Sequence, residues 1–481
     1  MRICLVATFP PSGRQLNEYA FHIARELQRN PDVELTILAD ELTDYDFATD
    51  ENGNAIKTSQ LAELPGFNVI RCWKFGGLAN PVRLLKTIRR LKPDVVWYNL
   101  VFSTFATPEN PFAAFAGLSA PALTRAAGFF THITLHHIVE HVDFAAAGVR
   151  REKLIRMGSY VATKALLKAH SVSVLLPGYR RTLISKYSAQ NVLLGSHGTF
   201  APNPSPPDFS KRGNPGLRIL AIGHWGTYKR LETLIEAFPA VLRKIPNARL
   251  IIAGANQHTK AGYWESIRDA QPAGLPIEFR GYVPEEAIPE LFQSTSVLAL
   301  PYDSATGSSG PAHQACEYGV PIVCADIGDF REMAAGEGMA IRFYRIGDAA
   351  DLAQQFIEIL DSPELQHQMA EQNFAAGVEM SMTGVVRNYL RWFALHKCKR
   401  EMRNAGRIPG FRPTWFQALR TKKASSRLKS REALPVLRKD DMDNSHGRVP
   451  GGSLAHVDTV RDSFAWSQPE ALEDQSNGVG D

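Results

Sequence analysis

The chain has 481 residues, of which 44% are hydrophobic and 21% are charged, a composition typical of a globular enzyme. This length is too great for one ordinary domain and predicts two domains with an appendage. The net charge of +5 does not by itself indicate a nucleic-acid-binding protein, and five scattered cysteines do not suggest a disulfide framework.

The N-terminus has only a short apolar run before two prolines, so it lacks the core of a signal peptide. No stretch reaches the roughly 18 uninterrupted apolar residues that a transmembrane helix needs. We therefore expect a cytoplasmic protein that at most lies on the inner face of a membrane.

Strand and helix patterns alternate through residues 1–200. Arg2–Thr8 is an apolar run typical of a buried parallel strand, and a turn and an amphipathic helix over Leu16–Leu27 follow it. We expect helices at Val82–Leu91 and Lys153–Ala169, and further strands at Glu34–Ala39, Asn68–Cys72, Val95–Tyr98, His132–Leu135, Val172–Leu176 and Val192–Gly195. This order predicts an N-terminal α/β domain with a mainly parallel sheet.

Residues 201–216 are dense in proline and glycine, as linkers are. The pattern restarts over residues 217–380, with strands at Arg218–Ile222, Arg249–Ala253, Ile277–Gly281, Val297–Leu300 and Pro321–Cys324 and helices at Leu231–Arg243, Glu286–Gln293 and Ala312–Tyr318. The predicted fold class is α/β, with two Rossmann-like domains facing across a cleft and ligands at the carboxyl ends of the strands.

The last segments differ from both domains. Apolar residues at helical spacing predict a helix over residues 381–397. Residues 398–481 are basic, then polar and acidic, which predicts a disordered tail. Its Lys and Arg residues alternate with Phe411, Trp415 and Phe416, a mixture that suits the interface of an anionic bilayer, although a solvated tail without a partner is the alternative.

The strongest local signal for a binding site is the run Ala305–Gln314, which follows a strand and opens a helix. Ser309 or Gly310 can cap that helix, and Pro311 suits its first turn. The free backbone N–H groups at the start of the helix can form an anion-binding site, for which a diphosphate is a suitable ligand. A helix that is merely well capped is the alternative.

A second signal is the segment from Gly223 to Lys229, which also lies between a strand and a helix. Lys229 can reach into the cleft and neutralise a phosphate that departs with negative charge. The alternative is a solvated lysine, but the helix dipole disfavours a cation at a helix start.

In the N-terminal half, His136 ends a strand and therefore lies at the ligand edge. Its neighbour His137 points the other way if both are extended, so only one is expected in the cleft; a hydrogen-bonded core histidine is the alternative. Gly13 allows close backbone approach in the first turn, beside Arg14, although an ordinary turn glycine would serve as well.

The sequence argues against a metal or a resident cofactor. His136, His137 and His141 have no accompanying carboxylates or thiols, and Asp44 and Asp46 lie in a polar loop that looks solvated. No Gly-x-Gly-x-x-Gly follows the first strand and there is no P-loop, so a dinucleotide dehydrogenase is not supported.

Taken together, these segments resemble the retaining glycosyltransferases of family 4, which have the GT-B fold, over nearly Met1 to His396. Gly223, Lys229 and Leu234–Phe238 match the family's loop and helix, and His136 sits at the position of a family histidine. Three further runs look like later family strands and loops: Leu250–Gly254, Phe279–Val283 and Tyr318–Val323.

The resemblance implies that the C-terminal domain binds a nucleotide-sugar donor and that the N-terminal domain faces the acceptor. Lys229 and the amides of Ser308–Gly310 would stabilise the leaving diphosphate, His136 would belong to the catalytic site, and the 381–397 helix would return to the N-terminal domain. A polysaccharide or a lipid-linked glycan is the acceptor that the resemblance suggests, with no nucleic acid as partner.

The chain departs from the family pattern at several site positions. Thr306 and Gln314 stand where the family has paired glutamates, His224 replaces an arginine, and Arg14 replaces the second glycine of the first loop. Both Thr306 and Gln314 can still donate hydrogen bonds, but charge-assisted bonds are roughly twice as strong as neutral ones. Either the affinity for the donor or the identity of the donor is therefore expected to differ from the family norm. A sugar-nucleotide epimerase and a non-catalytic relic that only binds a sugar nucleotide are the alternatives to a transferase.

Overall fold

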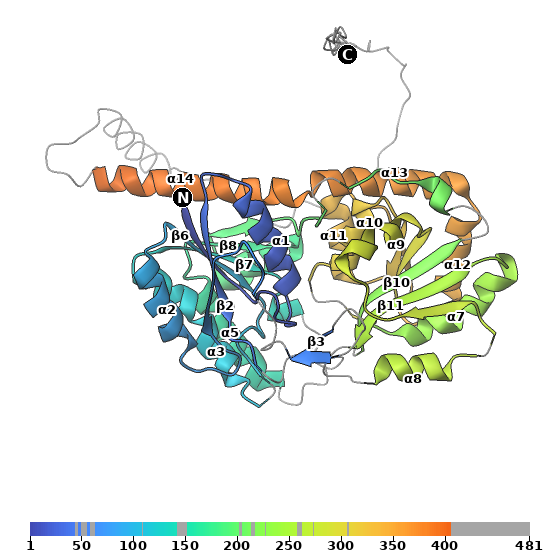
Figure 1. Cartoon of the computed structure of the whole chain (residues 1–481), viewed down its shortest axis with the longest axis horizontal. Helices are drawn as coiled ribbons and strands as arrows, with labels where there is room; N and C mark the ends of the chain where they lie inside the picture. Colours follow the sequence, from blue (N-terminus) through green and yellow to red (C-terminus); the bar gives the residue numbers. More distant parts are fainter. Residues whose placement is uncertain are drawn as a thin grey trace, which may run out of the picture. The chain divides into compact units, whose positions relative to one another are not determined.

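The computed structural model describes residues 1–405 except 44–46, 50–54, 58–62, 108, 142–151, 202–203, 213–216, 227, 257–261, 273 and 305–306. All described elements belong to one compact unit, Met1–Arg407, in which two parallel sheets are each covered by helices (Figure 1).

The N-terminal half contains a seven-stranded sheet in the order β5-β2-β1-β6-β7-β8-β9, and every pairing in it is parallel. Its strands are β1 Arg2–Val6, β2 Glu34–Asp40, β5 Val69–Trp73, β6 Val95–Leu100, β7 Phe130–Leu135, β8 Ser171–Val174 and β9 Val192–Leu194. A separate antiparallel pair is formed by β3 Phe47–Thr49 and β4 Ala55–Lys57.

Both faces of this sheet are buried, which explains the continuous apolar runs of its strands. Ile3 and Leu5 of β1 pack on the layer that holds α1 and α14, whereas Cys4 and Val6 pack on the opposite helices. The helices of this half are α1 Asn17–Gln28, α2 Asn80–Leu91, α3 Phe112–Leu118, α4 Ala120–Ala126, α5 Glu152–Leu166 and α6 Pro177–Tyr187, with a short 3-10 turn, η2, at Val139–His141.

The C-terminal half repeats this arrangement with a six-stranded parallel sheet in the order β12-β11-β10-β13-β14-β15. Its strands are β10 Arg218–Trp225, β11 Arg249–Asn256, β12 Ile277–Arg280, β13 Val297–Leu300, β14 Ile322–Ala325 and β15 Ile341–Tyr344. Its helices are α7 Leu231–Lys244, α8 Tyr263–Ala270, α9 Ile288–Gln293, α10 Gly310–Glu317, α11 Gly328–Glu337, α12 Ala349–Leu360 and α13 Pro363–Glu379, with the 3-10 turn η4 at Glu285–Ala287.

The chain crosses between the halves twice, and the two crossings lie side by side. Thr199 forms a parallel bridge with Ser381, and its N–H donates to the carbonyl of Met380 at 3.0 Å. In the first crossing, the 3-10 turn η3 at Phe209–Arg212 is fastened to the C-terminal half, because the buried guanidinium of Arg212 donates to three backbone carbonyls there.

The last described helix, α14 Met382–Ala405, packs on the N-terminal half (Figure 1). Met382, Val386 and Phe393 are buried in the same apolar cluster as residues of β1, α1 and β6. The helix therefore returns to the N-terminal half as the family resemblance implied, but it ends at Ala405 rather than at residue 397. Residues 406–481, which hold most of the predicted tail, lie outside the described part of the chain.

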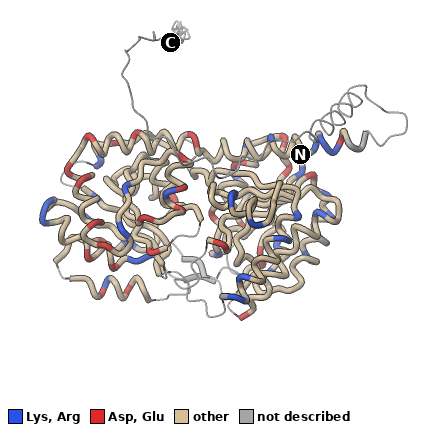
Figure 2. The backbone as a smooth tube through the Cα atoms, turned by 180° about the vertical axis from the view of Figure 1, so that it is seen from behind, with Lys and Arg blue, Asp and Glu red and all other residues tan. Residues whose placement is uncertain are grey.

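The predicted fold class is confirmed: the protein is α/β, with two Rossmann-like halves. The five cysteines are free, as their spacing suggested. Lys, Arg, Asp and Glu are interspersed along both halves (Figure 2). Among the described residues, no helix combines the length and apolar character that a membrane span requires.

Candidate functional site

Two loops of the C-terminal half meet beyond the carboxyl ends of neighbouring strands β10 and β13. Lys229 forms backbone bridges with Gly226 in its own turn and with Tyr302 in the loop after β13. The N–H of Arg230 donates to the carbonyl of Pro301 at 2.8 Å. Lys229 is therefore fixed at the ligand edge of the sheet, where its position in the sequence predicted it.

The Lys229 ammonium lies close to the Tyr302 ring and to the backbone of Gly223. Its Nζ is 5.1 Å from the centre of the Tyr302 ring and would be 3.2 Å from a Cβ at Gly223. Since Gly223 has a φ of 155°, the backbone there favours glycine as well. Burial lowers the pKa of Lys229 to about 8. The neighbouring Arg230 is more exposed and is paired with Glu232 and Asp303.

The start of α10 is capped as the sequence predicted. The Ser309 hydroxyl accepts a hydrogen bond from the N–H of Ala312 at 3.4 Å, and Pro311 lies in the first turn. A Cβ at Gly310 would meet no atom within 4 Å, so the space beside its Cα is open. Ser308 donates to the sulfur of Met333 at 3.7 Å. Thr306 lies outside the described residues.

The loop before α10 touches the N-terminal half at His136. Gly307 has a φ of 91°, and a Cβ there would lie 2.5 Å from the carbonyl oxygen of His136. The imidazole of His136 is buried, with Nε2 2.7 Å from the Asn99 Oδ1 and the ring set edge-on to Tyr19. Burial holds the pKa of His136 well below its usual value, so this imidazole is neutral near pH 7.

The other predicted site residues have the following surroundings. The Arg14 guanidinium sits 4.6 Å from the ring centre of Phe75, which follows β5 at the opposite edge of the sheet from β7 to β9. Gly13 and His224 are exposed, and Gln314 is half-buried on α10. The structure thus places Lys229 beside the loop after β13, and the loop before α10 beside the backbone of His136.

Sequence reasoning missed the carboxylates that join the two halves. On α11, Asp329 accepts from the Tyr179 hydroxyl at 2.6 Å, Glu332 accepts from the N–H of Gly178, and Glu337 accepts from the Ser196 hydroxyl at 2.9 Å. All three acids follow the carboxyl end of β14. That position was the available signal, because loops and helix starts at this edge face the ligand side.

A fourth carboxylate, Glu317 on α10, holds the first crossing between the halves. It accepts hydrogen bonds from the backbone N–H groups of Phe200, at 3.0 Å, and Ala201. Burial raises the pKa of Glu317 to about 7. Glu317 therefore connects α10 to the segment that joins the two halves.

The residues weighed as metal ligands take other partners. His141 Nδ1 is 3.2 Å from the Asp329 Oδ1, and its Nε2 is 3.1 Å from the Thr182 hydroxyl. Asp44 and Asp46 lie outside the described residues. Within the described ranges, no group of three or more His, Cys, Asp or Glu side chains is arranged to hold a metal ion.

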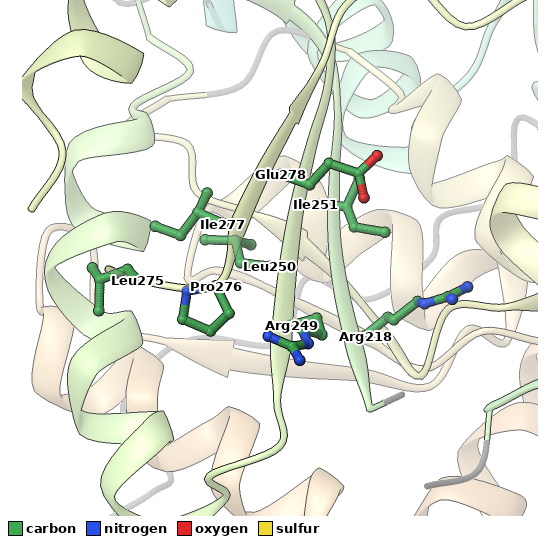
Figure 3. A pocket seen from close by; sticks show the side chains of 8 residues that line it. All are labelled: Arg218, Arg249, Leu250, Ile251, Leu275, Pro276, Ile277 and Glu278. Atoms are coloured by element: carbon green, nitrogen blue, oxygen red, sulfur yellow. The ribbon is translucent and has the colours of Figure 1, made fainter. Parts of the chain in front are cut away.

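Two cavities lie at the amino ends of the strands, one in each half. One of about 370 Å³ is lined by Arg218, Arg249 and Ile277, which stand at the amino ends of β10, β11 and β12 (Figure 3). The other, of about 1200 Å³, is lined by residues that include Arg2, Val95 and Phe130 in the N-terminal half. Because both are at the amino ends of strands, neither coincides with the edge where Lys229 lies.

Residues 216–362, which include Lys229 and the start of α10, match a family model described as Glycosyl transferases group 1. This part of the chain is therefore similar to the glycosyltransferases of group 1. The predicted resemblance is thereby confirmed at the level of the glycosyltransferases of group 1, for the half that carries the predicted donor site. No curated protein sequence matches the chain.

Solved structures share the fold of this chain over both halves. Anabaena Alr3699/HepE, crystallised with UDP and glucose, is 14% identical, with 82% of this chain and 99% of that chain covered and a TM-score of 0.59. Sucrose-phosphate synthase from Thermosynechococcus elongatus is 15% identical, with 82% and 100% covered and a TM-score of 0.61. The lipopolysaccharide outer core galactosyltransferase WaaB is 13% identical, with 82% and 100% covered and a TM-score of 0.53.

Proposed function

We propose that this glycosyltransferase moves a sugar from a nucleotide-diphosphate donor to an acceptor hydroxyl, with retention at the anomeric carbon and without a metal. One observation carries the proposal: the partly desolvated Lys229 ammonium and the capped start of α10 lie at the same edge of one sheet. A cation and free helix amides together suit a diphosphate. The complexes of HepE with UDP and with UDP-glucose support a donor of this kind.

The proposed step breaks the bond between the sugar's anomeric carbon and the diphosphate oxygen and forms a bond to the acceptor oxygen on the same face. The acceptor's proton passes to the departing diphosphate. Lys229 and the amides from Ser308 to Gly310 would stabilise the negative charge that develops there. His136 would belong to the catalytic site, because its neutral imidazole, hydrogen-bonded to Asn99, lies where the two halves meet.

A panel of labelled nucleotide sugars tests the proposal. Donors that bind should raise the melting temperature, since a ligand that binds only the folded state stabilises it. A transferase then passes the label to an acceptor hydroxyl, or slowly to water. Formation of an isomeric nucleotide sugar would instead identify an epimerase, and binding without any turnover would identify a non-catalytic relic.

The pH dependence of kcat/KM should report Lys229. Because its pKa is lowered to about 8, the free enzyme carries the cation below pH 8 and loses it as the pH rises above 8. We expect kcat/KM for the donor to fall about tenfold per pH unit above that value, and kcat to fall at higher pH, because a bound diphosphate favours the charged amine. A profile that stays level from pH 7 to 10 contradicts the assignment.

Metal independence is the second expectation. The proposed site uses a lysine and helix amides where single-domain sugar transferases use a carboxylate-bound cation. Turnover with the identified donor should be unchanged, to within about twofold, in excess EDTA. Loss of turnover that Mn²⁺ or Mg²⁺ restores would refute the proposal.

A polysaccharide or a lipid-linked glycan remains the proposed acceptor class, with the enzyme in the cytoplasm and the basic tail as a peripheral membrane contact. The sequence of residues 398–439 supports this through its Lys and Arg residues interleaved with aromatic ones. Sedimentation with anionic liposomes at low salt, with and without residues after Lys399, tests the contact; equal binding of both chains would exclude the tail.

A further inference from the structure

The carboxylate of Asp329 is the only one on α11 whose recorded contacts reach both the opposite half and the loop before α10. Its Oδ2 accepts from the Tyr179 hydroxyl at 2.6 Å and from the N–H of Gly307 at 3.3 Å. Its Oδ1 lies 3.2 Å from the Nδ1 of His141. One buried side chain therefore joins η2, α6 and the loop that leads to α10.

The position of Gly307 has consequences for the start of α10. Gly307 is buried against the His136 carbonyl, where there is no room for a Cβ, and its φ of 91° favours glycine. Only Ser308 separates it from Ser309, the residue that caps α10. A displacement of Gly307 would therefore move the capping residue and the first backbone N–H groups of α10.

The contacts of Asp329 with the N-terminal half depend on the approach of the two halves. Tyr179 is fully buried, and its hydroxyl donates to Asp329 across the boundary between them. If the halves separate, the carboxylate loses the Tyr179 and His141 partners and keeps only Gly307 among its recorded partners. Water can replace these partners once the boundary opens, but it does not fix the position of the carboxylate, so the Gly307 loop is held less firmly after separation.

Two other acids on α11 bind the N-terminal half without reaching this loop. Glu332 accepts from the N–H of Gly178 at the start of α6 and pairs with Arg181. Glu337 accepts from the Ser196 hydroxyl at 2.9 Å and lies 2.9 Å from the Nε2 of His313. Glu332 thus offers a matched control, because it strengthens the boundary but has no recorded contact with Gly307.

We propose that Asp329 is a positioning residue for the transfer reaction. It holds Gly307, and through it the start of α10, in the geometry that receives the donor's diphosphate, and it does so fully only when Tyr179 and His141 complete its hydrogen bonds. The halves then close and the diphosphate-binding geometry of α10 forms in the same conformational change. This inference rests on the proposed function of the start of α10.

The test compares Asp329→Asn, Tyr179→Phe and the control Glu332→Gln, with UDP as the probe. Asp329→Asn and Tyr179→Phe should each raise the UDP Kd about tenfold, although Tyr179 lies on the half opposite α10, and the double variant should be no weaker than Asp329→Asn alone. Glu332→Gln should change the Kd by less than about twofold. Additive effects, or an unchanged Kd in Tyr179→Phe, overturn the proposal.

Amide hydrogen exchange of residues 307–312 in the free proteins separates this inference from the proposed function. Faster exchange in Asp329→Asn and Tyr179→Phe, but not in Glu332→Gln, supports the positioning role whether or not UDP binds. If the variants show this exchange pattern but the wild type binds no nucleotide sugar, the proposed function fails and the positioning of the loop stands. Equal exchange in all the variants overturns the positioning role, and Tyr179→Phe gives this answer even if Asp329→Asn does not fold.

Discussion

Replacing Lys229 by alanine is expected to lower the turnover number about a hundredfold or more, comparable to the loss of one oxyanion-stabilising donor in other enzymes. The reason is that this ammonium is already partly stripped of water, so its attraction to a departing diphosphate is screened less than that of a surface cation. Single-turnover kinetics with the identified donor measures the chemical step directly, and near-normal turnover in the variant would refute the role.

Arg230→Ala is the matched control for this variant. Arg230 is the next residue, carries the same charge, and is more exposed and paired with Glu232 and Asp303. Its removal should change turnover by less than about threefold, because exposed ion pairs contribute little. A drop equal to that of Lys229→Ala would mean that the net charge of this loop matters, rather than the position of one amine.

The stability of a Lys229 variant should not fall with its activity. The pKa of Lys229 is lower in the folded protein than the ordinary value of 10.5, so the charged form opposes folding. This cost is fully present below pH 8, falls as the pH rises from about 8 and is absent above about 10.5. Lys229→Met, which keeps the apolar stem, should therefore melt at pH 7 no lower than the wild type while remaining inactive.

Local features of the sequence predicted the bounds of β13 and the helix cap correctly, although β10 and β11 extend three residues beyond their predicted ends. β13 occupies Val297–Leu300 as predicted, and Ser309 caps α10, because both depend on side chains within a few residues of one another. The same local information failed at the end of α14. Composition placed the tail from residue 398, yet the segment up to Ala405 contains Arg, Glu, Met and Ala, which are good helix formers, and the helix continues.

Side-chain directions at the candidate site could not be predicted, because their partners are distant in the chain. His136 lies at the predicted strand end, but its ring bonds to Asn99, which is 37 residues away. Asp329 and Tyr179 are 150 residues apart and meet only after both halves have folded. Periodicity locates a residue on an edge of a sheet, whereas only the folded chain shows which of its neighbours it contacts.

The packing of α14 is the basis of the largest expected effect on stability. Phe393 is fully buried, with its ring centre 5.4 Å from that of Trp97, 5.2 Å from that of His132 and 6.0 Å from that of Phe130. Phe393→Ala should lower the free energy of unfolding by about 3–5 kcal/mol, since it removes buried apolar surface and leaves a cavity between the helix and the sheet.

Leu395 on the same helix provides the control, because its side chain is 44% exposed. Leu395→Ala should change the free energy of unfolding by less than about 0.5 kcal/mol, and both variants keep the helix-forming character of the segment. Urea denaturation followed by tryptophan fluorescence measures the difference, since Trp97 lies beneath Phe393. If the two variants were equally stable, α14 would not be packed on the N-terminal half in solution. In that case, residues after Ser381 could be removed without loss of stability, whereas the contacts of Phe393 require that such a truncation be destabilised at least as much as Phe393→Ala.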